Sequence, residues 1–115
     1  MNIGFYFPNE KFCERDCSNL DKGNPGIGGT FWAMLQLIYL LSKDKKDENK
    51  YFLLLEKKMK IPQEILTIII KNKNNITHEL LSHNINILLV NKTGPKSLTT
   101  SFFYKIRSVL ITRFI

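Results

Sequence analysis

The sequence predicts an α/β protein with a Rossmann-like open, mostly parallel sheet and helices on both faces. Short apolar runs of strand length alternate with segments that have a helical pattern. The strand-like runs are apolar nearly throughout, as expected when both faces of a sheet are covered. The chain has 115 residues, of which 43% are hydrophobic and 23% are charged, so it resembles one globular domain rather than a disordered segment.

The first half of the chain is predicted as strand, long loop and helix. Residues 2–7, "NIGFYF", form an apolar run that ends at a proline and reads as a strand. Residues 9–29 form a polar connection, and loops of this length inside a compact domain are often functional. Residues 30–43 are predicted as a helix with Thr30 as its N-cap. Because this helix is apolar almost all round, we expect it to pack on more than one neighbour.

The second half continues the alternation. Residues 51–56 are predicted as the second strand and residues 65–70, which are β-branched, as the third. A helix led by the preceding proline is the alternative for that third segment. A short helix over residues 77–83 and a strand over residues 85–91 follow. Residues 97–115 are predicted as a final helix, since their apolar positions fit a helical stripe made of Phe102, Phe103, Ile106, Val109, Leu110 and Phe114.

The net charge of the chain indicates which class of partner it attracts. The net charge is +7 and lysines dominate the excess, which attracts anions in general. The aromatic residues do not interleave with basic residues on one strand, and no helix-turn-helix or RNP-like signature is present. We therefore do not expect nucleic acid as a partner.

The spacing of the cysteines and histidines allows them to be compared with metal ligands. Cys13 and Cys17 have the C-x3-C spacing, and His78 and His83 have the H-x4-H spacing, both of which occur in zinc sites. The gap between the two pairs is much longer than in a zinc finger. The pattern favours two reduced thiols and two surface histidines, so we expect no metal.

The N-terminus lacks a basic region and a cleavage site for a secretory signal. With few cysteines, the default location is cytoplasmic, with the inner face of the membrane as an alternative. Residues 26–42 carry no charge, but their strongly apolar part, residues 31–41, is too short to span a bilayer. A buried helix is the favoured interpretation of this run.

The most distinctive motif is "KGNPGIGGT", residues 22–30, which holds four of the six glycines. It lies between the first strand and the first helix, where free N–H groups and the helix dipole suit a phosphate. The dinucleotide fingerprint fails because Phe31 replaces its third glycine, and the P-loop fails because Gly29 replaces its lysine. Two interpretations stay open here: close approach of a phosphate, or a turn that only needs glycine.

Three segments together resemble a known enzyme family. A short strand and a long loop lead into "NPGIGGT" at the start of a helix, and "IPQEILTIIIKN" and "NINILLVN" follow. This arrangement resembles the N-terminal domain of GT-B glycosyltransferases, most of all the retaining family 4 type, or group 1 proteins, of surface polysaccharide pathways. The resemblance covers residues 1–93 and is most specific over residues 24–30.

The resemblance implies a nucleotide-sugar donor and a glycan or lipid-linked acceptor, with no cofactor and no metal. It assigns no catalytic residue. It places near the donor phosphates Gly26, Gly28, Gly29 and Thr30. The acceptor-side positions that it suggests are Asn24, Asn91 and Lys92.

In such enzymes a C-terminal domain binds the nucleotide, so we expect residues 1–115 to be a truncated N-terminal domain that is inactive alone. A partner chain would then supply the missing domain. The chain departs from the family at Phe31, where an acidic residue is usual, and at Asn91 and Lys92, where many members have a histidine. Two alternatives are a non-catalytic α/β binding module and a basic protein associated with a membrane surface.

Overall fold

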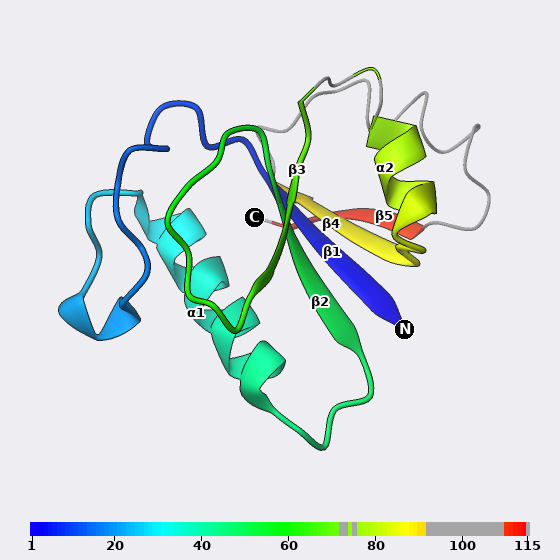
Figure 1. Ribbon diagram of the computed structural model, residues 1–115, viewed down its shortest axis with the longest axis horizontal. Helices are drawn as coiled ribbons and strands as arrows, with labels where there is room; N and C mark the ends of the chain where they lie inside the picture. The colour runs from blue at the N-terminus through cyan, green and yellow to red at the C-terminus, as the bar shows by residue number, and fades with distance from the viewer. Residues whose placement is uncertain (72–73, 75, 92–109, 115) are drawn as a thin grey trace.

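The computed structural model describes residues 1–71, 74, 76–91 and 110–114 (Figure 1). Within these residues, strands and helices alternate along the chain, and a 3-10 turn, η1 (Leu20–Lys22), lies in the first long loop. The strands and α-helices are β1 (Asn2–Phe7), α1 (Gly29–Lys43), β2 (Lys50–Leu55), β3 (Leu66–Ile69), α2 (Ile76–Ser82), β4 (Ile87–Asn91) and β5 (Leu110–Phe114).

The five strands form one sheet in the order β3-β2-β1-β4-β5, and every pair of neighbours is parallel. Phe7 is opposite Leu55 of β2, and Tyr6 is opposite Val90 of β4. The chain runs outward from β1 to β3 and then returns to the other side of β1. The strand order therefore reverses between β1 and β4, where open parallel sheets bind ligands at their carboxyl ends. The predicted Rossmann-like α/β fold is confirmed.

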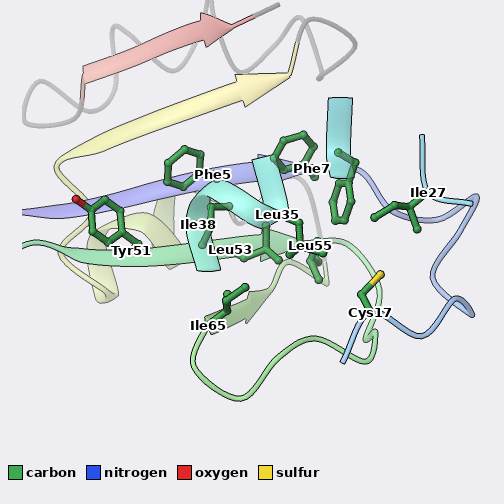
Figure 2. Close-up of a cluster of buried hydrophobic side chains, with 11 residues drawn as sticks. Phe5, Phe7, Cys17, Ile27, Leu35, Ile38, Tyr51, Leu53, Leu55 and Ile65 are labelled. Carbon is green, nitrogen blue, oxygen red and sulfur yellow. The ribbon is translucent and has the colours of Figure 1, made fainter. Parts of the chain in front are cut away.

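Each face of the sheet packs under a different helix (Figure 1). Because side chains alternate along a strand, neighbouring residues of β1 and β2 belong to different cores. The α1 face buries Phe5, Phe7, Cys17, Ile27, Phe31, Leu35, Ile38, Tyr51, Leu53, Leu55 and Ile65 (Figure 2). The α2 face buries Tyr6, Leu54, Ile68, Ile70, Ile76, Leu80, Ile85 and Leu88.

Two predictions about the first helix are wrong. The N-cap is Gly28 rather than Thr30, because the backbone enters the helix with a φ of 84° at Gly28, a conformation that favours glycine. The helix also buries one side only. Leu37 and Leu40 are 44% and 65% exposed, because α1 lies on the outside of the sheet and no other described element covers its outer side.

The end of the chain also differs from its prediction. The proline-led helix considered for residues 65–70 is wrong, and the predicted strand is confirmed as β3. The final helix is wrong over residues 110–114, which form β5 beside β4. Leu110 and Phe114 are four residues apart, a spacing that also places two residues on one side of a strand. The other four stripe positions, Phe102, Phe103, Ile106 and Val109, lie outside the described residues.

Candidate functional site

A pocket of about 470 Å³ lies where the carboxyl ends of β1 and β2 meet the start of α1. Its apolar wall consists of aromatic rings from three parts of the chain. Phe31 of α1 meets Phe7 of β1 edge to face, with ring centroids 4.7 Å apart, and Phe12 of the loop at 4.9 Å. Gly28, Gly29 and Thr30 line the pocket from the helix side.

The long loop before α1 is held against the body of the protein. Cys17 and Ile27 are buried in the α1-face core (Figure 2). The Cys17 N–H donates to the Lys60 carbonyl at 2.9 Å, so the loop is joined to the connection between β2 and β3. Burial raises the pKa of the Cys17 thiol to about 11, with a further contribution from the charge of Asp16. The loop that forms part of the pocket wall is therefore held in place by the burial of Cys17 and Ile27 and by the hydrogen bond to Lys60.

Most of the glycine motif is explained by backbone geometry. Gly23, Gly26 and Gly28 have φ values of 86°, 98° and 84°, which residues with a Cβ rarely adopt. The side-chain oxygen of Asn24 accepts hydrogen bonds from the N–H groups of Gly26 at 2.9 Å and Ile27 at 3.0 Å. This turn shapes the approach to α1, so the turn interpretation accounts for three of the four glycines.

Gly29 is not explained in the same way. It is the first residue of α1, its φ is not positive, and a Cβ added to it would meet nothing within 4 Å. Glycine in a helix is less stable than alanine by about 0.5–1 kcal/mol. Gly29 is exposed and lines the pocket. Neither the backbone conformation nor the packing of the described residues requires a glycine here.

The N-terminus of α1 has N–H groups directed beyond the helix. The first N–H groups of any α-helix have no partner within it. Gly28 makes no side-chain cap, because it has no side chain. Gly28, Gly29 and Thr30 are exposed at the pocket. This part of the pocket can donate hydrogen bonds and favours negative charge.

Charged side chains line the other parts of the pocket, among them Glu10, Lys11 and Glu56. Glu56 follows β2 directly, and its carboxylate accepts a hydrogen bond of 3.3 Å from the Tyr6 hydroxyl. Tyr6 is fully buried. Its pKa is raised well above the usual range, first by burial and then by the charge and hydrogen bond of Glu56. The Tyr6 hydroxyl therefore stays protonated and donates to Glu56.

Asn9 fixes the backbone beside this carboxylate. It is the only fully buried polar side chain of the described part other than tyrosine and cysteine. Its Nδ2 donates to the Lys57 carbonyl at 2.7 Å, and its Oδ1 accepts from the N–H groups of Glu56 at 3.0 Å and Lys57 at 2.8 Å. The exits of β1 and β2 are thereby joined. Sequence reasoning missed Tyr6, Asn9 and Glu56, although polar residues at the ends of two apolar strands were visible.

The structure brings only some of the predicted site residues together. Gly28, Gly29 and Thr30 share the pocket, while Asn24 and Gly26 lie in the turn that precedes it. Asn91 ends β4 at the same edge of the sheet as Phe7, the last residue of β1. Lys92 lies outside the described residues.

The two cysteines and two histidines that have zinc-ligand spacing come from separate parts of the fold. Cys13 and Cys17 lie in the loop before α1, His78 lies on α2 and His83 follows it. In the part of the chain that the structure describes, no group of three or more His, Cys, Asp or Glu residues could hold a metal ion. Among the same residues, neither helix combines the length and apolar character needed to cross a membrane.

Comparisons of this chain with protein-family models, curated proteins and solved structures found no match. The function therefore has to be argued from the fold, the pocket and the motif that leads into α1.

Proposed function

We propose that this chain is the acceptor-side, N-terminal domain of a GT-B glycosyltransferase of the retaining type. Together with a C-terminal nucleotide-binding domain, it transfers a sugar from a nucleotide-sugar donor to a glycan or lipid-linked acceptor in surface polysaccharide biosynthesis. The reaction needs both domains, and the glycine motif of this domain contacts the donor diphosphate. The resemblance of residues 24–30 to that family and the parallel sheet order support the proposal.

The observation that carries the proposal is Gly29. Three glycines of the motif are needed for positive φ, whereas Gly29 sits at the pocket with open space where its Cβ would be. A side chain there would point into room that a ligand could use, so a closely bound molecule gives a reason for glycine. A diphosphate fits this position, since it combines negative charge with several hydrogen-bond acceptors.

In this proposal, different groups of the pocket act on the leaving phosphate during sugar transfer. When the bond between the sugar and the diphosphate breaks, negative charge develops on the leaving phosphate. N–H groups at the start of α1 would stabilise that charge without needing to rearrange. Lys11, on the loop side of the same pocket, adds a positive group. This role requires no bound metal.

The test compares Gly29→Ala with the wild-type protein. Amide NMR spectra of the full 115-residue chain are followed during titration with UDP-glucose, UDP-N-acetylglucosamine and GDP-mannose. We expect at least one of these donors to shift the amide signals of residues 28–31 in the wild type. Gly29→Ala should keep or raise the thermal midpoint, since alanine favours a helix, yet it should weaken binding.

Two controls separate binding from folding. Gly28→Ala should lose about 1–2 kcal/mol of stability, because it forces a left-handed backbone on a residue with a Cβ. Gln36→Ala, on the exposed part of α1, should change neither binding nor stability. Unchanged affinity in Gly29→Ala, or no shift with any donor in the wild type, would contradict the proposal.

A further inference from the structure

We propose that the edge strand β3 binds a second copy of this chain, with the two β3 strands paired antiparallel so that both sheets become one. The backbone groups of Thr67 and Ile69 form the interface, and Glu64 and Lys71 flank it. This inference is independent of the proposed function, because β3 does not line the pocket at the start of α1.

The outer edge of β3 carries unpaired backbone groups. In the described part of the chain, β3 has a strand neighbour on one side only. The Ile70 N–H, directly after β3, donates to the Leu55 carbonyl of β2 at 2.7 Å. Alternate residues of a parallel strand bond to the same neighbour, so Thr67 and Ile69 direct their N–H and carbonyl groups away from β2. Among the described residues, no other segment bonds to these groups, which makes them a template for a further strand.

This edge lacks the usual protection against strand pairing. Residues 65–70 include no charged residue and no proline, which are two common devices that prevent it. Leu66 is 48% exposed, and Thr67 is exposed as well. The connection from β2 to β3, residues 56–65, contains no helix (Figure 1). The chain therefore enters β3 without a crossover helix that could cover its edge.

A second copy fits this edge in one antiparallel register. When Ile68 of one copy is opposite Ile68 of the other, Thr67 of each copy is opposite Ile69 of the other. The residues with outward backbone groups then face each other, and each pair exchanges two hydrogen bonds. The same contact is made twice across a two-fold axis. On the α2 face, the exposed Leu66 comes opposite Ile70 of the second copy.

The charges at the ends of β3 favour a second copy in this direction. Glu64 precedes the strand, Lys71 follows it, and both are exposed. Neither forms an ion pair with another described residue. In the antiparallel register, Lys71 of one copy is opposite Ile65 of the other, directly beside Glu64. Opposite charges therefore meet at both ends of the interface, whereas parallel pairing in register would bring like charges together.

The first experiment follows association of the full chain by sedimentation velocity between about 1 and 500 µM. A four-residue strand buries less surface than the roughly 1,200–2,000 Å² of a stable complex, so we expect a concentration-dependent dimer. Amide hydrogen exchange at Thr67 and Ile69 should slow as the dimer forms, because their N–H groups are paired only there. A monomer at every concentration, with unchanged exchange, would overturn the inference.

Thr67→Pro tests the backbone pairing. Its missing N–H is one that points away from β2, and proline is tolerated at such edge positions. The variant should keep the fold, as judged by circular dichroism and the thermal midpoint, and should remain a monomer over the same range. A folded Thr67→Pro that dimerises like the wild type contradicts the proposal. If this variant does not fold, the charge variants decide.

Glu64→Lys and Lys71→Glu test the direction of pairing. Each single variant should lower the association constant roughly three- to tenfold, because two weak attractions in each dimer become repulsions. The double variant should recover the association of the wild type, since opposite charges meet again. Failure of the double variant to recover would overturn the antiparallel arrangement. Glu48→Lys, at an exposed carboxylate in the connection between α1 and β2, is the matched control and should leave the dimer unchanged.

Leu40→Ser tests the other exposed apolar surface, the outer side of α1, where Leu40 is 65% exposed. It should leave the dimer intact. Dissociation by Leu40→Ser, with no effect of Thr67→Pro, would place the interface on α1 and overturn the inference. Donor binding by a chain that stays monomeric would leave the proposed function standing alone, and a β3 dimer that binds no donor would leave this inference standing alone.

Discussion

The two faces of the sheet are built from the same strands but have different extents and chemistry. Among the described residues, the α2 face is a mainly aliphatic core in which Tyr6 is the one tyrosine. The α1 face is richer in aromatic rings and continues beyond the end of the sheet through residues of the long loop, Cys17 and Ile27. The pocket lies at that continuation, on the side where α1 begins.

The strands themselves do not create this difference, because β1 and β2 contribute alternate residues to both faces. The connections create it. Residues 8–28 separate β1 from α1 and have room to form a wall, whereas residues 70–75 alone separate β3 from α2. Tyr6 and Glu56 make a polar contact at the carboxyl edge of the sheet. The pocket therefore lies where a long connection follows a central strand.

The largest expected effect comes from removing a core side chain on each face. Phe31→Ala should cost about 3–5 kcal/mol and Leu80→Ala about 2–5 kcal/mol, since both are buried and a cavity remains. Their local consequences should differ. Phe31 contacts Phe12 of the loop, so its loss should speed amide hydrogen exchange at Cys17 and Ile27.

Denaturant unfolding and native-state hydrogen exchange would measure these two effects. Leu80→Ala should leave exchange at Cys17 and Ile27 close to that of the wild type, once the change in global stability is subtracted. Leu81→Ala is the control, because Leu81 is 51% exposed on the same helix, and it should change stability by at most about 0.5 kcal/mol. Equal loosening of the loop by Phe31→Ala and Leu80→Ala would show that the two faces unfold as one unit.

A smaller effect is expected at the polar junction between β1 and β2. Asn9→Ala leaves two N–H groups and one carbonyl without the partner that Asn9 supplies. An unsatisfied buried group costs about 1–3 kcal/mol, and water reaching the pocket edge should keep the total near that range. Urea unfolding of Asn9→Ala beside the wild type would measure the loss. Equal unfolding midpoints would show that these hydrogen bonds add nothing to stability.

Most of the fold could be predicted because alternating apolar runs reveal strands and helices directly. Two errors have a common cause. The sequence shows how apolar residues are spaced, but it does not show which parts of the fold cover them. The even spacing of Leu110 and Phe114 suits a strand as well as a helix. The apolar outer side of α1, with Leu37 and Leu40, resembles a buried surface although no described element covers it.

The site could be predicted only in part. The glycine motif marked the start of α1, but the N-cap depended on the positive φ of Gly28, which overrides the usual preference for threonine. The contact between Tyr6 and Glu56 depends on the register of β1 against β2. A slip of one residue would turn one of these side chains to the other face. Register is not visible in a single sequence, so this pair had to come from the structure.

The smallest expected effect lies at the opposite end of the α1 face. The Tyr51 hydroxyl donates to the Asp47 carboxylate, and the Asn49 N–H donates to it at 2.9 Å. These hydrogen bonds, Tyr51 first, lower the pKa of Asp47 below its ordinary value. A carboxyl whose pKa is lower in the folded state contributes stability above its unfolded pKa of about 4 and loses it as the pH falls through the folded value.

Asp47→Asn should therefore lower stability slightly at neutral pH and flatten the loss of stability below about pH 4, because the small contribution of this carboxylate is then absent at every pH. Tyr51→Phe removes the hydrogen bond that is the main cause of the lowered pKa of Asp47, while it keeps the ring in the α1-face core. It should therefore also flatten the loss of stability at low pH. Thermal melts from pH 2 to pH 7 would measure both, and the double variant should add nothing further. Binding at the pocket should be unchanged in each variant, since Tyr51 is the second residue of β2, at the end of the strand opposite to Glu56. If acid destabilisation in the double variant equals that of the wild type, the Asp47 carboxylate does not contribute to the stability of the folded state.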